Sequence, residues 1–269
     1  MKIVVLDGFA LNPGDLSWNA VAELGEFELH DRTCGELILD RAAGAEVLLT
    51  NKTPLSAGTM AKLPNLRYIG VLATGYNVVD VQAATERGIV VTNVPSYGTH
   101  AVTQMVFALL FALTRRAQLH SDAVMAGDWT ASKDFCFWNT PQSELTDKTM
   151  GIVGFGRIGR RTAQVADAFG MRVVAADAVR DNPSNLANFA WRDIPELLVE
   201  SDVVTLHCPL VPETQGLMNR KTLGLMKRTA FLINTSRGPV VVEQDLADAL
   251  NQGLIAGAGL DVLNAEPPA

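Results

Sequence analysis

The stretch Met150-Gly151-Ile152-Val153-Gly154-Phe155-Gly156-Arg157-Ile158-Gly159 decides the fold of this 269-residue chain. A short apolar run ends in a Gly-x-Gly-x-x-Gly sequence, and apolar residues at helical spacing follow as far as Phe169. This order predicts a strand, a tight turn and a helix, which is the context that a phosphate-binding glycine loop requires. Gly154 permits the turn, Gly156 lets the backbone approach a pyrophosphate, and Gly159 lets helix and strand pack closely.

The start of the predicted helix and the next acidic residue together indicate a dinucleotide site. Backbone N–H groups around Arg157 and Ile158 are available to phosphates, and the Arg157 side chain can add a contact to the same anion. Asp177 follows the next apolar run, eighteen residues after Gly159. A carboxylate there accepts hydrogen bonds from ribose hydroxyls and repels a 2′-phosphate, so the pattern predicts NAD as the cofactor. Arg180 leaves NADP as the alternative.

Short β-branched runs alternate with helical segments along the whole chain, which is typical of parallel sheets covered by helices. The pattern predicts an α/β fold with two doubly wound parallel-sheet domains. Residues 1–98 would form a flavodoxin-like substrate-binding domain and residues 99–269 a Rossmann NAD-binding domain, with a hinge near residues 95–100. The segment from Gly98 to Ala117 is predicted to be one long, largely buried helix that bridges the domains.

Composition and charge exclude several classes of protein. The net charge of −7 argues against a nucleic-acid or anionic-membrane partner, because both call for a basic face. The most apolar stretch, from Met105 to Leu113, is much shorter than the roughly 20 residues that a membrane span needs. Three scattered cysteines without a Cys-x-x-Cys pair fit reduced thiols in the cytoplasm. No metal site is predicted.

Residues 118–147 break the alternation of strands and helices. Four aromatic residues, Trp129, Phe135, Phe137 and Trp138, lie in an otherwise polar stretch that is predicted to be a turn-rich loop. Exposed aromatic side chains on a long loop often mark an interface, and burial against the core of the same chain is an equal alternative. If the interface reading holds, residues 98–147 form the contact of a homodimer.

With these residues placed, the chain resembles the D-isomer-specific 2-hydroxyacid dehydrogenases over nearly its whole length, from Ile3 to Pro267. The aromatic loop around Trp138 favours the branch of that family that acts on D-glycerate and hydroxypyruvate. Besides the glycine loop, the resemblance is carried, in chain order, by VLATGYN at 71–77, NVPSY at 93–97, Gln104, DFCFW at 134–138, HCPL at 207–210, NTSRG at 234–238, and GLDV at 259–262 with Glu266-Pro267.

The resemblance implies a set of substrate contacts. Arg237 would grip the carboxylate and the 2-oxo group of a small acid, which a guanidinium can do bidentately without changing its protonation. Taken alone, Arg237 could equally be a surface arginine after a turn. Backbone N–H groups around Thr74 and Gly75 would hold the substrate carboxylate. Glu266 would hydrogen-bond a catalytic histidine and raise its pKa.

The resemblance also implies cofactor contacts at the ends of later strands. Asp261 would accept a hydrogen bond from the nicotinamide carboxamide, the alternative being an aspartate that only caps a turn. His207 has the alternative of a strand-end histidine without a ligand. The remaining contacts would come from His207, Cys208 and Pro209 on the adenosine side and from Thr235 and Ser236 on the nicotinamide side.

The catalytic histidine of the family is expected about twenty residues beyond Glu266-Pro267, whereas this sequence stops at Ala269. The four histidines present, His30, His100, His120 and His207, do not occupy the motif position. The sequence is therefore expected to be a truncated form that lacks the histidine, the closing strands and the last helix. Since general acid catalysis contributes about 10²–10⁴-fold, such a form should be a poor catalyst.

Together these features predict an NAD-dependent enzyme that interconverts a small D-2-hydroxy acid and its 2-oxo acid, with D-glycerate and hydroxypyruvate as the preferred pair. One alternative is a sibling dehydrogenase for lactate, glyoxylate or phosphoglycerate. Another is an NAD-sensing binding protein that works through partner contacts, as corepressors of this family do. Arg237 and Glu266, and the lack of a peptide-docking signature, weigh against that second alternative.

Overall fold

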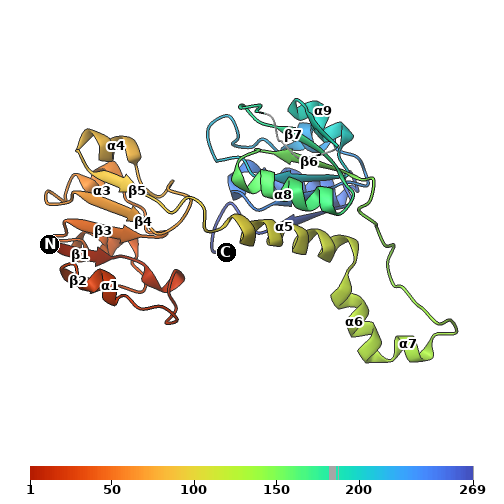
Figure 1. The fold of residues 1–269 in the computed structure, drawn as a ribbon, viewed down its shortest axis with the longest axis horizontal. Coiled ribbons are helices and arrows are strands. Elements are labelled where there is room, and N and C mark those ends of the chain that lie inside the picture. Colours follow the sequence, from red (N-terminus) through yellow and green to blue (C-terminus); the bar gives the residue numbers. More distant parts are fainter. Residues whose placement is uncertain (182–185, 187, 269) are drawn as a thin grey trace. The chain divides into compact units, whose positions relative to one another are not determined.

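The computed structural model describes residues 1–181, 186 and 188–268, and it divides into two compact units. Unit 1 comprises Met1–Gly98 and unit 2 comprises Thr99–Ala269. Figure 1 shows unit 1 in red to yellow and unit 2 in yellow-green to blue. Within the described residues, no helix is long and apolar enough to cross a membrane.

Unit 1 is built around one parallel sheet with the strand order β2-β1-β3-β4-β5. This is the flavodoxin-like order, in which the order of strand addition reverses beside the first strand. Short helices connect the strands. The strands are β1 (Lys2–Val5), β2 (Glu26–Leu29), β3 (Val47–Thr50), β4 (Tyr68–Val71) and β5 (Val90–Thr92), and the helices are α1 (Asn19–Ala22), α2 (Ile38–Arg41), α3 (Ala57–Met60) and α4 (Val81–Glu86).

Burial and helix capping explain why unit 1 adopts this fold. Val4, Leu48 and Ile69, from three adjacent strands, are completely buried in one hydrophobic cluster. Helices α3 and α4 begin at Ser56 and Asp80, whose side chains accept hydrogen bonds from backbone N–H groups in the first turn. The apolar runs of the central strands therefore form the sheet because folding buries their side chains in this cluster.

Unit 2 contains a six-stranded parallel sheet with the order β11-β10-β9-β6-β7-β8. Counted from β6, this is the 3-2-1-4-5-6 order of the Rossmann fold. The prediction of a flavodoxin-like domain followed by a Rossmann domain is thus confirmed. The strands are β6 (Thr149–Val153), β7 (Arg172–Ala176), β8 (Phe189–Trp191), β9 (Val203–Leu206), β10 (Phe231–Asn234) and β11 (Gly257–Leu260).

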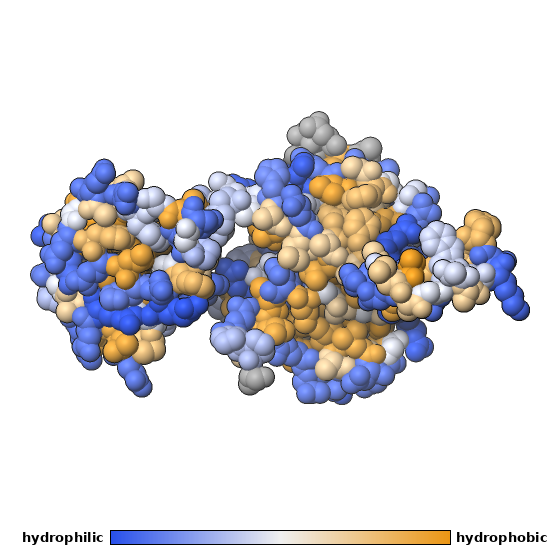
Figure 2. All heavy atoms as spheres, turned by 90° about the horizontal axis from the view of Figure 1, so that it is seen from below, coloured by the Kyte–Doolittle hydropathy of each residue, from blue (hydrophilic) through white to orange (hydrophobic). Residues whose placement is uncertain are grey.

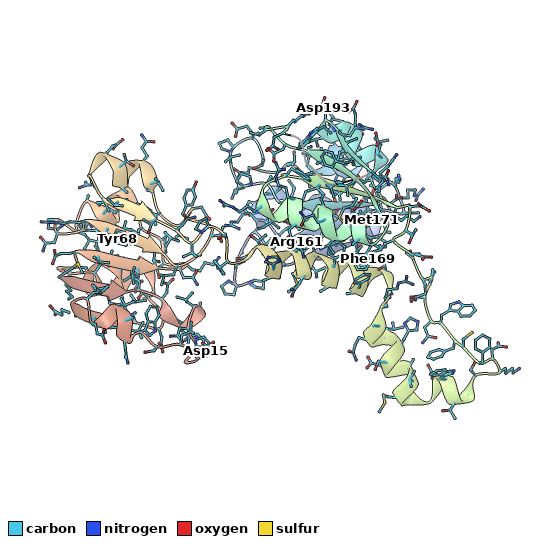
Figure 3. All side chains as sticks on the ribbon, viewed as in Figure 1. Asp15, Tyr68, Arg161, Phe169, Met171 and Asp193 are labelled. Carbon is cyan, nitrogen blue, oxygen red and sulfur yellow. The ribbon has the colours of Figure 1, made fainter. Side chains whose placement is uncertain are left out.

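Helices cover the sheet of unit 2, and the first helix of this unit packs against both the sheet and a neighbouring helix. Helix α5 (Thr99–Thr114) packs against α8 (Arg157–Ala168), β10 and β11, so this helix belongs to unit 2. Phe169, which follows α8 and is labelled in Figure 3, packs its ring at a tilt against Phe107 and edge-on against Phe111 in α5. The remaining helices of the sheet are α9 (Ile194–Glu200), α10 (Arg220–Leu223) and α11 (Glu243–Asn251).

The structure corrects the prediction for residues 98–147. The predicted single helix ends at Thr114, because Arg116 adopts a left-handed backbone conformation with φ 46° that a helix cannot continue through. A second helix, α6 (Ala117–Ala126), and a short third one, α7 (Asp128–Ala131), occupy part of the stretch that was predicted to be a turn-rich loop. Both project from the body of unit 2 (Figure 1).

Candidate functional site

The glycine loop joins β6 to α8 at the carboxyl end of the unit 2 sheet, where parallel α/β sheets bind ligands. Gly154 has a φ of +92°, and a Cβ atom on it would lie 2.5 Å from the backbone nitrogen of Cys208. A Cβ atom on Gly159 would lie 2.2 Å from the carbonyl oxygen of Gly154. Both glycines are therefore required by the protein's own backbone packing.

Gly156 differs from the other two glycines of the loop. A Cβ atom there would meet nothing within 4 Å, and the φ of −74° is open to any residue. Gly156 is also the N-cap of α8, and no side chain caps the helix. The first N–H groups of α8, those of Arg157 and Ile158 among them, thus border open space, as a pyrophosphate-binding loop requires.

Asp177, directly after β7, faces the glycine loop. One oxygen of its carboxylate accepts a hydrogen bond from the Phe155 N–H at 2.5 Å, and the other accepts one from the Val179 N–H at 3.1 Å. Each carboxylate oxygen can accept a further hydrogen bond. The structure therefore holds a fixed negative charge beside the loop, with capacity left for ribose hydroxyls.

His207, Cys208 and Pro209 follow β9 and lie beside Gly154. His207 Nε2 lies 3.0 Å from the Thr205 hydroxyl oxygen, and burial lowers the pKa of His207 to about 4. Burial likewise raises the pKa of the Cys208 thiol to about 11. Neither side chain changes its charge near neutral pH. His207 therefore lines this part of the loop as a neutral ring near neutral pH.

The loop after β10 is organised by Asn234, a residue to which the sequence assigned no role. Its side-chain oxygen accepts hydrogen bonds from the backbone N–H and the hydroxyl of Ser236, and its amide donates to the Arg237 carbonyl oxygen. The half-buried Arg237 also donates from Nη1 to the Ser236 carbonyl oxygen at 2.7 Å. Asn234 was recognisable only as the first residue of the NTSRG motif.

Thr235 supplies a test of whether this loop suits a cofactor. Its side chain is buried, and among the described residues its hydroxyl oxygen has no hydrogen-bond partner. A buried polar group without a partner destabilises a fold unless a ligand or water satisfies it. Together with the open space at Gly156 and the carboxylate of Asp177, this hydroxyl fits the dinucleotide that the sequence predicts.

The last described segment packs against the loop that carries Arg237. A Cβ atom on Gly238 would lie 2.0 Å from the backbone carbon of Leu263, so only glycine fits there. Burial, and then the negative charge of Glu266, raise the pKa of Asp261. Glu266 accepts a hydrogen bond from the Leu263 N–H at 3.0 Å. Arg237, Asp261 and Glu266 thus lie on two backbone segments that touch at Gly238.

Thr74 and Gly75 belong to unit 1, in the loop after β4. The Thr74 hydroxyl donates to the Val94 carbonyl oxygen at 2.9 Å, and the Asn93 amide donates to the Thr74 carbonyl oxygen at 2.7 Å. These bonds fix the loop to the segment that follows β5. The other predicted site residues all lie in unit 2.

A flavodoxin-like unit followed by a Rossmann unit, with a glycine loop and an acidic residue after the second Rossmann strand, defines a two-domain dinucleotide-dependent oxidoreductase. Two family models extend this conclusion. The D-isomer specific 2-hydroxyacid dehydrogenase catalytic domain matches residues 4–181, and the NAD binding domain of the same family matches residues 107–269. The chain therefore belongs to the D-isomer specific 2-hydroxyacid dehydrogenases, whose cofactor is NAD.

Individual relatives agree with this assignment. The chain is 48% identical to a hydroxypyruvate reductase from Blautia hydrogenotrophica, over 99% of its own length and 84% of the relative's. It is similar to a D-lactate dehydrogenase from Aquifex aeolicus complexed with NAD and lactic acid, with a TM-score of 0.87, 28% identity, and 99% and 78% of the two chains covered. It also matches an acyclic imino acid reductase in complex with NADPH and D-Arg, with a TM-score of 0.87, 33% identity, and 98% and 84% covered.

Proposed function

We propose that this chain interconverts D-glycerate and hydroxypyruvate and prefers NAD over NADP. The observation that carries the proposal is Arg237, held by Asn234 on the same sheet end as the glycine loop, Asp177 and the unsatisfied Thr235 hydroxyl. The 48% identity to a hydroxypyruvate reductase supports this choice of acid. Bound NAD supplies or accepts the hydride.

Arg237 is proposed to bind the carboxylate and polarise the 2-oxo group. Its Nη1 already donates to the Ser236 carbonyl oxygen, so the guanidinium is oriented before substrate arrives. A guanidinium keeps its charge at all relevant pH values and has five N–H donors, which leaves enough for two acceptors on the acid. Thr74 and Gly75 are proposed to contribute backbone donors to the same carboxylate.

The other residues of the proposed site would orient the cofactor and distinguish NAD from NADP. Asp177 would accept from the adenosine ribose and repel a 2′-phosphate, while Thr235, Ser236 and Asp261 would contact the nicotinamide side. Partial desolvation and the nearby negative charge of Glu266 both raise the pKa of the Asp261 carboxyl. Glu266 is proposed to hydrogen-bond and orient the histidine that transfers the proton. That histidine is not His207, which stays neutral near neutral pH.

The function is tested by NADH oxidation with hydroxypyruvate, glyoxylate, pyruvate and phosphohydroxypyruvate as competing acids. Hydroxypyruvate should give the highest kcat/KM. Arg237→Gln should lower that kcat/KM by about 10³-fold or more, because a donor to the reacting oxygen is lost, while NADH still binds. Arg228→Gln, which removes another arginine of unit 2 that donates to the Gly253 carbonyl oxygen, is the matched control.

Each result of this assay has a defined meaning. A higher kcat/KM for another acid would replace glycerate by that substrate within the same family. Saturable NADH binding with no turnover of any of the four acids would favour the alternative of an NAD-sensing protein. Equal activity of Arg237→Gln and Arg228→Gln would remove Arg237 from the proposed mechanism.

We also propose a homodimer formed through residues 98–147. Phe135 and Trp138 are 91% and 68% exposed, on the loop that follows α7. An open groove of about 610 Å³ beside them is lined mainly by apolar atoms, with Trp129, Phe137 and Trp138 among its walls. Figure 2 shows hydrophobic residues gathered on the face of unit 2 that it views. A second copy of the chain would remove these rings from water.

A further inference from the structure

Two arginines, Arg180 after β7 and Arg160 in α8, are each engaged by an aspartate. Arg180 donates to the Asp193 carboxylate and, at 3.3 Å, to the Arg192 carbonyl oxygen. Arg160 pairs with Asp181 and lies over the ring of Phe155. Neither of these two guanidinium groups is therefore free to pair with an anion beside Asp177.

The position of Arg180 relates its ion pair to the choice between NAD and NADP. Asp177 directly follows β7 and accepts a hydrogen bond from the Val179 N–H, and Arg180 is the next residue after Val179. A cation close to the ribose-binding carboxylate is the group that accommodates a 2′-phosphate in NADP-binding Rossmann folds. Arg180 has the charge for that role, but its guanidinium is directed to the start of α9 instead.

Asp193 is the residue that holds Arg180 there. It is the N-cap of α9, at the place marked in Figure 3, and its own N–H donates to Glu196 at 3.3 Å. The backbone of Asp193 is thus held at the helix start by a contact that does not involve Arg180. A fixed carboxylate competes with any phosphate for the same guanidinium and adds a negative charge near it.

We propose that Asp193 is a cofactor-specificity residue: by binding Arg180 it withholds the cation that a 2′-phosphate needs, and so it reinforces the exclusion of NADP by Asp177. This inference rests on the proposed preference for NAD and adds a second residue to it. Asp193 acts through Arg180 and is a positioning residue. It need not contact the cofactor.

The exposure of the pair sets the size of the expected effect. Arg180 and Asp193 are 45% and 72% exposed at their side chains, so water and salt weaken their attraction. Releasing Arg180 should therefore improve binding of a 2′-phosphate by roughly fivefold, and the gain should shrink at high ionic strength. The gain should be largest when Asp177 no longer repels the phosphate.

The experiment is a double-mutant cycle with Asp177→Ser and Asp193→Ser. Serine is a good N-cap, so α9 should stay intact, while its side chain is too short to reach the guanidinium. Dissociation constants of NADH, NADPH and the fragment 2′,5′-ADP are measured by fluorescence titration and calorimetry, beside kcat/KM with each nucleotide. The double variant should bind NADPH and 2′,5′-ADP about fivefold more tightly than Asp177→Ser alone.

Two further variants separate this role from a structural one. Arg180→Ala, added to the double variant, should abolish the gain for 2′,5′-ADP. Glu196→Gln, in the Asp177→Ser background, alters the same helix start without touching Arg180, and it should leave the NADPH to NADH ratio unchanged.

The outcomes distinguish this inference from the proposed function. Equal NADPH binding by Asp177→Ser and the double variant would overturn the inference, as would a gain that survives Arg180→Ala. Both results leave the NAD preference of the unaltered protein intact. Tighter binding of NADPH than NADH by the unaltered protein would instead contradict the proposed cofactor preference itself.

Discussion

His207 illustrates how a single residue acquires its chemistry from its surroundings. The sequence leaves open whether it contacts a cofactor or merely ends a strand. In the structure it lies next to Gly154 and the buried Thr205 hydroxyl, and burial alone lowers its pKa to about 4 from an ordinary 6.5. A histidine in this state contributes a neutral hydrogen-bonding ring to unit 2.

The stability of unit 2 should depend on pH through His207. Above pH 6.5 the ring is neutral in both the folded and the unfolded chain. As the pH falls from 6.5 toward 4, the unfolded chain gains a proton that the folded chain does not, so the free energy of unfolding decreases. The decrease attributable to His207 should be about 1–3 kcal/mol.

Urea unfolding over this pH interval, compared between the unaltered chain and His207→Asn, measures that contribution. His207→Asn should lose less stability on acidification, because asparagine does not titrate. His100→Asn, which removes an exposed histidine of α5, should behave like the unaltered chain. Parallel pH profiles for the unaltered chain and His207→Asn would show that the ring is not buried as described.

The strand β6, the glycine loop and helix α8 together combine packing with ligand binding. Its three motif glycines have different reasons to be glycine. At Gly154 and Gly159 an added carbon would collide with backbone atoms, whereas at Gly156 it would extend into open space. The first two positions serve the fold, and the third is free to serve a ligand.

Gly156→Ala should therefore impair cofactor binding, whereas Gly159→Ala should impair stability. Gly156→Ala should keep the thermal midpoint of the unaltered chain but raise the Kd for NADH about tenfold or more, because the methyl group occupies space needed by the pyrophosphate. Gly159→Ala should lose about 1–3 kcal/mol of stability through overpacking. Thermal unfolding and NADH titration measure the two effects, and unchanged NADH binding by Gly156→Ala would contradict the assigned role.

Across the molecule, each unit carries its own sheet and hydrophobic core, and unit 2 carries an additional projecting segment. That segment contains α6, α7 and the aromatic loop, and it contributes less to the core than the rest of unit 2. Exposed aromatic rings on such a segment are costly in water unless a partner covers them. This is the reason for assigning the dimer contact to it.

The dimer is tested by measuring mass in solution. Light scattering should give the unaltered protein a mass of twice the 28.9 kDa of one chain. The double substitution Phe135→Ser/Trp138→Ser should shift it to a single chain, because the two most exposed rings of the loop are removed. Leu16→Ser, which removes a 64% exposed apolar residue from unit 1, should leave the dimer intact. A double variant that remains dimeric would place the contact elsewhere.

Several parts of the fold and site could be predicted from the sequence because they depend on short stretches. The spacing of apolar residues indicated most strands of both sheets, and the glycine loop with Asp177 indicated the Rossmann unit. The prediction was wrong for residues 118–147, where α6 lacks a strong apolar periodicity and its start depends on the left-handed Arg116. The strand β8 was also missed, because its residues Phe189, Ala190 and Trp191 include no β-branched residue.

The amino-acid order by itself determined the two sheets, the family and the cofactor class, since apolar periodicity and glycine geometry act within a few turns of chain. Only the tertiary structure decided which distant groups meet. Folding brings together the segments that bury His207 and that leave open space at Gly156. It also creates the contact of Gly238 with Leu263 and the ion pair of Arg180 with Asp193. Their physical basis is packing and charge in three dimensions, which no local pattern records.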